Sequence, residues 1–382
     1  MTKTSTTKVI ILLPSLAGGG AERTVMNILK AYDRNKFTIK VLLISNEGEY
    51  SSSFCEDDII YNQSDFLARN FFWQLYFFIC KTIPFHFRCL KAEKPDVVMT
   101  VTESMNYYGY FLNVLRVIKC KWIIRSGNNI FAEARSKGLI SGKFLQLLLR
   151  KSYQRADHLI TISNGAKSSI LKKFTIPTEN ITTIYNPIDL KKIKKMASSP
   201  CLNGLEKPFF LGIGRLAKQK RFDSMIRAFY ESDVHSRGYQ LIILGEGPER
   251  ASLQKLVNNL SLNEHVKFMG FQNNPYAYLR RAKCFLLSSE WEGFAHVIAE
   301  ALACDTEVIS IDCKFGPSEI LSNGKYGKII DSNEPNLFRN AIRRFVENED
   351  RDLHLDKKQR ASDFDLSVII PQYEKLLSKL AK

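Results

Sequence analysis

Residues 288–303, SSEWEGFAHVIAEALA, follow the short apolar run Cys284–Leu287 and carry the clearest indication of the architecture. The apolar run predicts a buried strand, Gly293 predicts a turn, and the apolar spacing after Gly293 predicts a helix. A strand, a turn and a helix in this order point backbone N–H groups at an anion beside the helix N-terminus. The stretch therefore predicts a ligand site at the end of a strand in an α/β sheet.

Two carboxylates, Glu292 and Glu300, stand on either side of this predicted helix start. Glu292 falls in the predicted loop, and Glu300 falls more than one turn inside the helix. A carboxylate in such a place accepts hydrogen bonds from vicinal hydroxyls, as the acidic residue of a dinucleotide site does for ribose. The alternative is that both are solvated residues of a turn and a helix, because Glu is common on helices.

Strand-like and helix-like segments alternate along the 382 residues, which predicts parallel sheets covered by helices on both faces. A chain of this length is too long for one ordinary core, so two domains are expected. The predicted strands of the first half are Lys8–Pro14, Phe37–Ser45, Asp96–Val101, Lys121–Arg125, His158–Ile162 and Ile181–Tyr185. Those of the second half are Lys207–Gly214, Gln240–Leu244, Val266–Met269, Cys284–Leu287 and Glu307–Ile311.

A break in composition separates the two halves. A lysine-rich segment is followed by Ser-Ser-Pro and Asn-Gly, so we place a linker near residues 190–206. The domains are then expected at residues 1–190 and 207–365. Apolar residues recur on one side of Leu366–Leu380, which predicts an amphipathic helix within residues 366–382.

The composition is 45% hydrophobic and 25% charged, as in an ordinary folded protein, but the formal net charge is +16. Excess positive charge, larger in the first half, predicts an anionic partner: nucleic acid, anionic lipid or phosphorylated small molecules. The eight cysteines form no C-x-x-C pair, which favours a reducing compartment. Val9–Leu13 is too short for a signal-peptide core, and no apolar run reaches the roughly 18–20 residues of a membrane span. A cytoplasmic location is expected.

Glycines follow the first predicted strand as Gly18-Gly19-Gly20. They can cradle a phosphate, or they can form a plain tight turn. They do not complete a dinucleotide fingerprint, because Arg23 stands where its third glycine belongs. A dehydrogenase is therefore disfavoured.

Two cations follow the predicted strand Lys207–Gly214, Arg215 directly and Lys220 at the expected start of the next helix. Open α/β sheets bind ligands beyond the carboxyl ends of their strands. A guanidinium and an ammonium that converge there suit the two phosphates of a nucleotide sugar. The alternative is a pair of solvated surface cations.

Taken together and in chain order, these residues resemble glycosyltransferase family 4, the retaining transferases with two facing Rossmann-like domains of the GT-B architecture. Glu292 to Glu300 resembles the E-x7-E signature of that family, and Gly214-Arg215-Leu216 with Lys220 is similar to its donor-diphosphate motif. The resemblance covers nearly the whole chain. Its further matches are Gly18–Glu22, Ala156-Asp157, Ile162-Ser163-Asn164, Tyr185–Asp189, Asp312-Cys313 and Gly316–Leu321.

The resemblance implies a role for each matched residue. Arg215 and Lys220 would neutralise the donor pyrophosphate, Glu292 would bind hydroxyls of the transferred sugar, and Glu300 would bind the ribose. Retention would need no nucleophile from the enzyme, and neither a catalytic metal nor a cofactor is expected. The C-terminal helix would return to the N-terminal domain. Residues expected to line the donor pocket are Gly19, Gly20, Phe294 and Ala295; Arg215, Lys220 and Glu292 are the predicted catalytic residues.

Two positions depart from the family pattern. His296 stands where many relatives have a small or amide residue, so it contacts the donor or merely packs. Arg125-Ser126-Gly127-Asn128 stands where some relatives carry a catalytic His. Arg125 and Asn128 are therefore predicted as acceptor contacts, not as catalytic residues.

Residues 66–81 form an aromatic stretch with flanking cations. Its rings, Phe71, Phe72, Trp73 and Phe77 among them, suit a helix that lies in a membrane interface. The alternative is a helix packed with its aromatic residues against the N-terminal sheet. The basic first half favours contact with an anionic membrane, and hence a location at the inner face of the cytoplasmic membrane.

The sequence therefore predicts a retaining glycosyltransferase that moves a hexose or N-acetylhexosamine from a nucleotide-diphosphate sugar, with UDP as the expected nucleotide. The expected acceptor is a glycan or a polyprenyl-linked glycan of surface polysaccharide or lipopolysaccharide biosynthesis. One alternative is a sugar-nucleotide epimerase on the same fold. The other is a basic nucleic-acid-binding protein, for which no recognised module is present.

Overall fold

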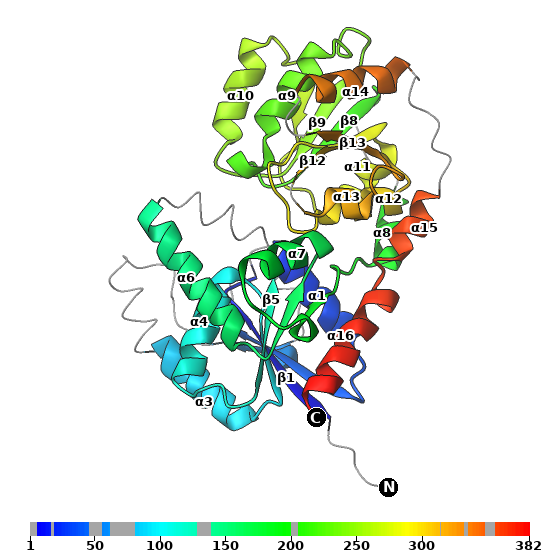
Figure 1. The fold of residues 1–382 in the computed structure, drawn as a ribbon. Coiled ribbons are helices and arrows are strands. Elements are labelled where there is room, and N and C mark those ends of the chain that lie inside the picture. Colours follow the sequence, from blue (N-terminus) through cyan, green and yellow to red (C-terminus); the bar gives the residue numbers. More distant parts are fainter. Residues whose placement is uncertain are drawn as a thin grey trace. The chain divides into compact units, whose positions relative to one another are not determined.

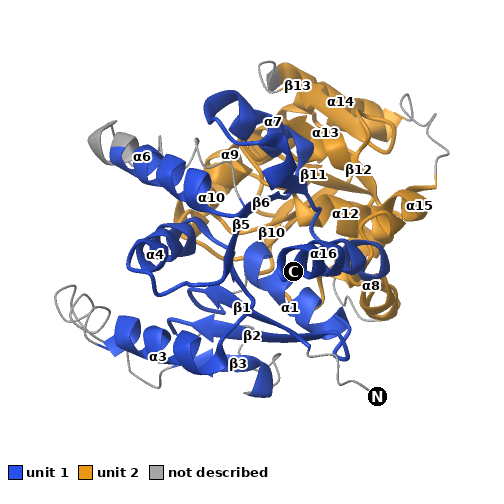
Figure 2. Ribbon diagram, turned by 60° about the horizontal axis from the view of Figure 1, so that its bottom comes forward, with its two compact units in different colours: residues 1–187, 366–382 blue, residues 188–365 orange. Residues whose placement is uncertain are grey.

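The computed structural model describes residues 6–16, 19–45, 56–61, 81–127, 139–199, 205–313, 315–331, 335–347 and 356–382. The chain divides into two compact units (Figure 2). Unit 1 combines Met1–Pro187 with Leu366–Lys382, and unit 2 is the continuous segment Ile188–Asp365. The chain therefore passes from one unit to the other twice.

Unit 1 is built on a seven-stranded sheet in which every neighbouring pair is parallel. The strand order is β3-β2-β1-β4-β5-β6-β7. Parallel strands are buried on both faces, and the continuous apolar run in the first strand meets this requirement. The strands are β1 (Thr7–Leu13), β2 (Phe37–Leu43), β3 (Ile59–Tyr61), β4 (Val97–Thr100), β5 (Lys121–Ser126), β6 (His158–Thr161) and β7 (Ile181–Thr183).

Helices cover both faces of this sheet (Figure 1). They are α1 (Gly20–Ala31), α3 (Ile83–Glu93), α4 (Glu103–Val114), α6 (Leu139–Arg155), α7 (Asn164–Lys173) and α16 (Leu366–Leu380), with single 3-10 turns η2 (Glu56–Asp58) and η4 (Thr178–Asn180).

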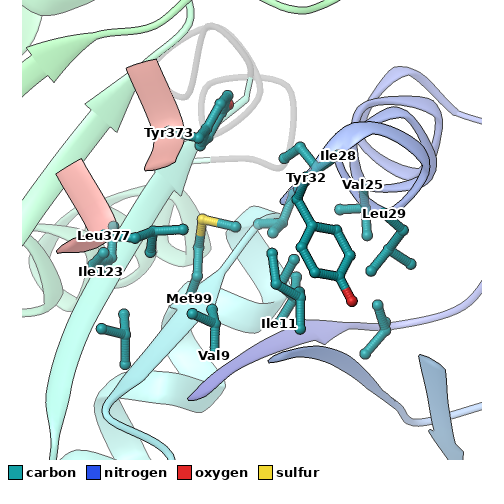
Figure 3. Packing of buried hydrophobic residues seen from close by; sticks show 14 of the residues in the cluster. Val9, Ile11, Val25, Ile28, Leu29, Tyr32, Met99, Ile123, Tyr373 and Leu377 are labelled. Atoms are coloured by element: carbon teal, nitrogen blue, oxygen red, sulfur yellow. The ribbon is translucent and has the colours of Figure 1, made fainter. Parts of the chain in front are cut away.

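Alternate residues of β1 enter two different cores of unit 1. Val9, Ile11 and Leu13 pack with α1 and α16, whereas Ile10 and Leu12 join the core under α3, α4 and α6. Figure 3 shows the first core, in which Tyr373 and Leu377 of α16 lie with residues of β1, β4 and β5. The period of two along the strand explains this division, because successive side chains point to opposite faces.

Unit 2 holds a six-stranded parallel sheet in the order β10-β9-β8-β11-β12-β13. Its strands are β8 (Phe209–Ile213), β9 (Gln240–Leu244), β10 (Val266–Phe268), β11 (Cys284–Leu287), β12 (Glu307–Asp312) and β13 (Lys328–Asp331). Its helices are α8 (Leu190–Ala197), α9 (Phe222–Glu231), α10 (Arg250–Asn259), α11 (Pro275–Arg281), α12 (His296–Ala303), α13 (Pro317–Ile320), α14 (Pro335–Glu347) and α15 (Lys357–Ser362), with the 3-10 turn η5 (Lys218–Lys220).

Two parallel sheets with covering helices confirm the predicted α/β fold class. Each strand expected from the sequence is present within a few residues of its expected bounds, and the short strands β3 and β13 come in addition. The structure differs from the expected linker at 190–206, because α8 begins at Leu190. The side chain of Asp189 accepts a hydrogen bond from the backbone N–H of Lys192 at 2.9 Å, and Ile193 is buried. The N-cap and the buried apolar side chain both stabilise this lysine-rich segment as a helix.

Among the described helices, none combines the length and the apolar character that crossing a bilayer requires.

Candidate active site

The chain order of unit 2 reverses between β8 and β11, which are neighbours in its sheet. In an open parallel sheet, ligands bind at such a reversal, beside the loops that follow the carboxyl ends of the two adjacent strands. The two loops here are residues 214–221 after β8 and residues 288–295 after β11. They contain five of the six donor residues predicted in the C-terminal half.

Hydrogen bonds hold these two loops together. Gln219 donates from Nε2 to the carbonyl oxygen of Trp291 at 2.8 Å, and its own carbonyl accepts from the N–H of Glu290 at 2.9 Å. Ser288 donates from Oγ to the carbonyl oxygen of Lys220 at 2.8 Å. The backbone of Lys220 is thereby fixed to the loop that carries Glu292.

Lys220 and Glu292, one from each loop, form an ion pair with Nζ 2.5 Å from Oε1. The same carboxylate oxygen accepts a hydrogen bond from the hydroxyl of Ser289 at 2.6 Å. Glu292 is 7% exposed and Ser289 is 1% exposed. Glu292 is therefore not the solvated turn residue of the alternative interpretation, and Lys220 is not a free surface cation. Charge-assisted hydrogen bonds of this kind orient a carboxylate strongly.

Glu300 lies in the second turn of α12 and is only 3% exposed. Its Oε1 accepts a hydrogen bond from the hydroxyl of Tyr276 on α11 at 3.2 Å. A buried carboxylate is costly unless hydrogen-bond donors satisfy it, so a solvated helix position is excluded for Glu300 as well.

The turn into α12 requires an unusual backbone. Ala295 is the N-cap residue and has a left-handed conformation, with φ of 58°. Gly316, with φ of 99°, comes so close that a Cβ atom on it would lie 2.8 Å from the carbonyl carbon of Phe294. Phe294 is buried, and the rings of His296 and Phe364 pack against it edge-on at 5.5 Å and 5.3 Å between centroids. His296 thus packs beside the turn.

Arg215 lies directly after β8 and its side chain is exposed. The backbone on either side of it is fixed, since Gly214 donates to the carbonyl of Leu244 at 3.0 Å and Leu216 donates to that of Glu246 at 2.9 Å. Arg215 therefore offers a solvated guanidinium on the same loop as Lys220, with no protein partner among the described residues. This exposure still permits the alternative of a surface cation.

Cys313 lies near the Lys220–Glu292 pair and is buried. Burial raises the pKa of its thiol, and the nearby carboxylate of Glu292 raises it further. The thiol stays protonated near neutral pH and is a poor nucleophile.

In unit 1 the chain order reverses between β1 and β4. Gly19 is the N-cap of α1, and Gly20 is its first residue. A Cβ atom on Gly19 would lie 2.5 Å from Oε2 of Glu22, so a larger residue there would require this carboxylate to move. Burial raises the pKa of Glu22, and the positive charge of Arg125 opposes that rise.

Arg125, at the end of β5, is 1% exposed and belongs to the interior of unit 1. Its Nε donates to the hydroxyl of Tyr373 at 3.1 Å, and its Nη2 donates to Oγ1 of Thr24 at 3.3 Å and to Oδ1 of Asn186. These bonds connect α1, the end of the N-terminal segment and α16. Contact of Arg125 with an acceptor stays a prediction. Asn128, Gly18 and the aromatic residues Phe71, Phe72, Trp73 and Phe77 lie outside the described residues.

Two side chains of this site were missed in the sequence. Ser289 stands within the signature stretch, but a serine beside a turn gives no sign of which group it will bind. Tyr276 is 24 residues from Glu300, and nothing in the sequence links the two.

Two family models match the chain in succession. Glycosyltransferase Family 4 matches residues 18–192, and Glycosyl transferases group 1 matches residues 201–362. The first match begins after β1 and extends into α8, and the second spans the strands and helices of unit 2 from β8 to α15.

Relatives and solved structures agree with these matches. An N-acetylgalactosamine-N,N'-diacetylbacillosaminyl-diphospho-undecaprenol 4-alpha-N-acetylgalactosaminyltransferase of Campylobacter jejuni is 28% identical over 94% of this chain and 96% of its own. The amylovoran biosynthesis glycosyltransferase AmsD of Erwinia amylovora is 21% identical over 97% of this chain and 99% of its own. The crystal structure of Anabaena HepE in complex with UDP and glucose superimposes with a TM-score of 0.78 at 20% identity, over 98% of this chain and 100% of that one.

The fold, the paired loops at the chain reversal of unit 2 and the two successive family matches lead to one conclusion: the chain is a glycosyltransferase of family 4 with the GT-B fold.

Proposed function

We propose that this enzyme transfers a hexose or an N-acetylhexosamine from a UDP-sugar to a glycan or lipid-linked glycan in surface polysaccharide or lipopolysaccharide biosynthesis, with retention of configuration. The observation that carries the proposal is the ion pair of half-buried Lys220 with buried Glu292 at the chain reversal of unit 2. An ammonium beside a carboxylate gives one group for a phosphate and one for a hydroxyl, and a nucleotide sugar presents both.

The donor contacts follow from this arrangement. Arg215 and Lys220 bind the pyrophosphate and stabilise the charge that develops as the glycosidic phosphate leaves. Glu292 accepts hydrogen bonds from hydroxyls of the transferred sugar, and Glu300 accepts them from the ribose. Backbone N–H groups of Phe294 and Ala295, at the start of α12, face the phosphate or the sugar.

The acceptor side is assigned to unit 1. Gly19 and Gly20, predicted to line the donor pocket, lie at the start of α1 beside the chain reversal between β1 and β4, where a substrate can approach the backbone closely. Relatives support a lipid-linked glycan acceptor, since the Campylobacter jejuni protein is named for a substrate on diphospho-undecaprenol and AmsD for amylovoran biosynthesis.

The experiment offers the purified protein a panel of UDP-sugars and GDP-sugars together with a membrane lipid extract, and it identifies products by mass. We expect one UDP-sugar to give an acceptor heavier by one sugar residue. Conversion of the donor into an isomeric nucleotide sugar without an acceptor would instead support the epimerase. Failure of every donor, in a protein that retains nucleic acid through purification, would support the nucleic-acid-binding alternative.

We also propose that the enzyme works at an anionic membrane surface. The net charge of +16 supports this, and so do the exposed side chains of Phe111, Val114 and Leu115 at the end of α4, directly before the exposed cation Arg116. Anionic liposomes should sediment the protein at low salt. Phe111→Ser with Leu115→Ser should weaken the binding, whereas Leu337→Ser, which removes an exposed leucine from α14 of unit 2, should not. Absence of wild-type binding at low salt would refute membrane contact.

A further inference from the structure

Each of the two buried glutamates of unit 2 accepts a hydrogen bond from the hydroxyl of one other buried side chain. We propose that Ser289 and Tyr276 are positioning residues with separate tasks: Ser289 orients Glu292 toward the transferred sugar, and Tyr276 orients Glu300 toward the ribose. The inference rests on the proposed function, which supplies the ligand of each carboxylate.

Among the described residues, hydrogen-bond donors reach only one oxygen of the Glu292 carboxylate. Both Lys220 and Ser289 donate to Oε1, at 2.5 Å and 2.6 Å, whereas Oε2 receives no hydrogen bond from the described residues. Two donors on one oxygen fix the plane of the carboxylate and leave the second oxygen as an acceptor for a ligand. Oε2 is thus the atom that the sugar hydroxyls meet.

Ser289 is needed because the ammonium of Lys220 has two acceptors in the complex, the carboxylate of Glu292 and the donor phosphates. This ammonium carries three N–H donors on a flexible stem, and the donor phosphates compete with Glu292 for them. Ser289 is 1% exposed and comes from the same turn as Glu292, so its hydroxyl does not depend on the ligand. When the ammonium moves toward a phosphate, Ser289 keeps the carboxylate in place.

Tyr276 acts from a different element, helix α11. The side chain of Asn274 caps this helix at the N–H of Ala277, 3.4 Å away, and its Nδ2 donates to the carbonyl of Met196 on α8 at 2.9 Å. Thr306 donates from Oγ1 to the carbonyl of Leu279, at the other end of α11, at 2.7 Å. The phenol of Tyr276, 8% exposed, therefore meets Glu300 from a fixed backbone.

The two tasks are separable because UDP contains the ribose but not the sugar. In Ser289→Ala, the affinity for UDP should stay within about twofold of wild type. The kcat/KM for the UDP-sugar should fall by about tenfold, the loss expected for one hydrogen bond to a charged group. Ser289→Thr, which restores a hydroxyl, should recover most of it. In Tyr276→Phe, the affinity for UDP should fall by about five- to tenfold, and KM should rise more than kcat falls.

Two matched variants serve as controls. Ser310→Ala removes a buried hydroxyl of β12 that donates to the carbonyl of Ile311 at 2.9 Å. Tyr278→Phe removes a phenol of the same helix α11 that donates to Gln272 at 3.3 Å. Both should retain wild-type affinity for UDP and wild-type kcat/KM. Affinities are measured by isothermal titration calorimetry, and turnover by UDP release from the donor that the panel identifies.

The result that overturns the inference is a lack of separation. If Ser289→Ala lowers the affinity for UDP by as large a factor as it lowers kcat/KM, the assigned tasks are wrong. They are also wrong if Tyr276→Phe binds UDP with wild-type affinity. Glu292→Gln distinguishes this failure from failure of the proposed function. If turnover is impaired in Glu292→Gln but normal in Ser289→Ala, only the positioning role is rejected. If turnover is normal in Glu292→Gln, the proposed site itself is rejected.

Discussion

Gly245, directly after β9, is so close to Gly214, directly after β8, that a Cβ atom on Gly245 would lie 2.0 Å from the carbonyl oxygen of Gly214. Gly214 directly precedes Arg215, so this contact sets the position of the backbone that carries the guanidinium. Gly245 also has φ of +129°, which side chains of L-residues rarely adopt.

Gly245→Ala should therefore displace the loop after β8 and reduce the affinity for UDP by at least about tenfold, since the clash is with backbone that cannot rotate away. Calorimetric titration with UDP measures it. Gly238→Ala is the matched control, because Gly238 has φ of +83° but no atom within 4 Å of the added Cβ. Gly238→Ala should lose only about 1 kcal/mol of stability through backbone strain. Its affinity for UDP should be normal. Equal UDP binding in both variants would contradict the steric explanation.

Arg215→Ala should lower the affinity for UDP and the affinity for the intact UDP-sugar by similar factors, because the guanidinium is expected to contact the diphosphate that both ligands share. A charged hydrogen bond on the rim of a site predicts a loss of about ten- to thirtyfold. Arg215 is exposed, so thermal stability should not change. Arg221→Ala, which removes an exposed cation paired with Asp223, is the control for charge alone. If Arg215→Ala binds UDP like wild type, the pyrophosphate role is wrong.

Glu292→Ala and Glu300→Ala should both lose transfer while the fold is retained. Contacts made more strongly in the transition state than in the ground state appear in kcat, so Glu292→Ala should lower kcat by about a hundredfold or more. Glu300→Ala should act mainly through KM for the donor. Circular dichroism verifies the fold. Normal turnover in both variants would reject the donor site.

Arg125→Met should destabilise unit 1 by about 3–5 kcal/mol, because it leaves the buried carboxyl of Glu22 and three hydrogen-bond acceptors without their cation. Tyr373→Phe removes only one of these acceptors and should cost about 1 kcal/mol. Urea unfolding of both variants measures the difference. A similar, small loss in both would show that the charge of Arg125 does not matter to stability.

Stability should decline as the pH falls below 6.5, in part because of His86. Burial lowers the pKa of His86 from 6.5 to about 4, and the ring bonds to the hydroxyl of Tyr108 and the carbonyl of Leu43. Between these pH values the unfolded chain binds a proton that the folded protein does not, so the stabilisation is complete above pH 6.5 and is lost toward pH 4. At pH 5 the loss should be on the order of 2 kcal/mol. His86→Gln, which does not titrate, should show a shallower pH dependence in urea unfolding. An unchanged slope would contradict this.

The fold was readable from the sequence because its signals are local. Parallel strands buried on both faces appear as short apolar runs, and the period of apolar residues in Leu366–Leu380 matches α16. The exception is α8, where lysines on the exposed side concealed a helix fixed by Asp189 and Ile193. Composition alone indicated a linker there.

The candidate site was predictable only in part. Glu292, Glu300, Arg215 and Lys220 follow from spacing around two strand ends, which is a property of the sequence. Glu292 and Lys220 are 72 positions apart in the sequence. They can form an ion pair because β8 and β11 are neighbours in the sheet. The hydroxyl of Tyr276 comes from yet another helix. Such partners are set by tertiary packing, which no local pattern encodes.

Helix α16 has a consequence for the order in which the protein can be made. It contributes Ile369, Ile370, Tyr373, Leu376 and Leu377 to the core that β1 and α1 begin, yet all of unit 2 lies between them in the chain. On the ribosome, where domains generally fold as units as they emerge, unit 2 can complete its core before unit 1 can. The N-terminal segment must wait with an open apolar face until α16 has been translated, so nascent chains that stall within unit 2 should be the ones that chaperones retain.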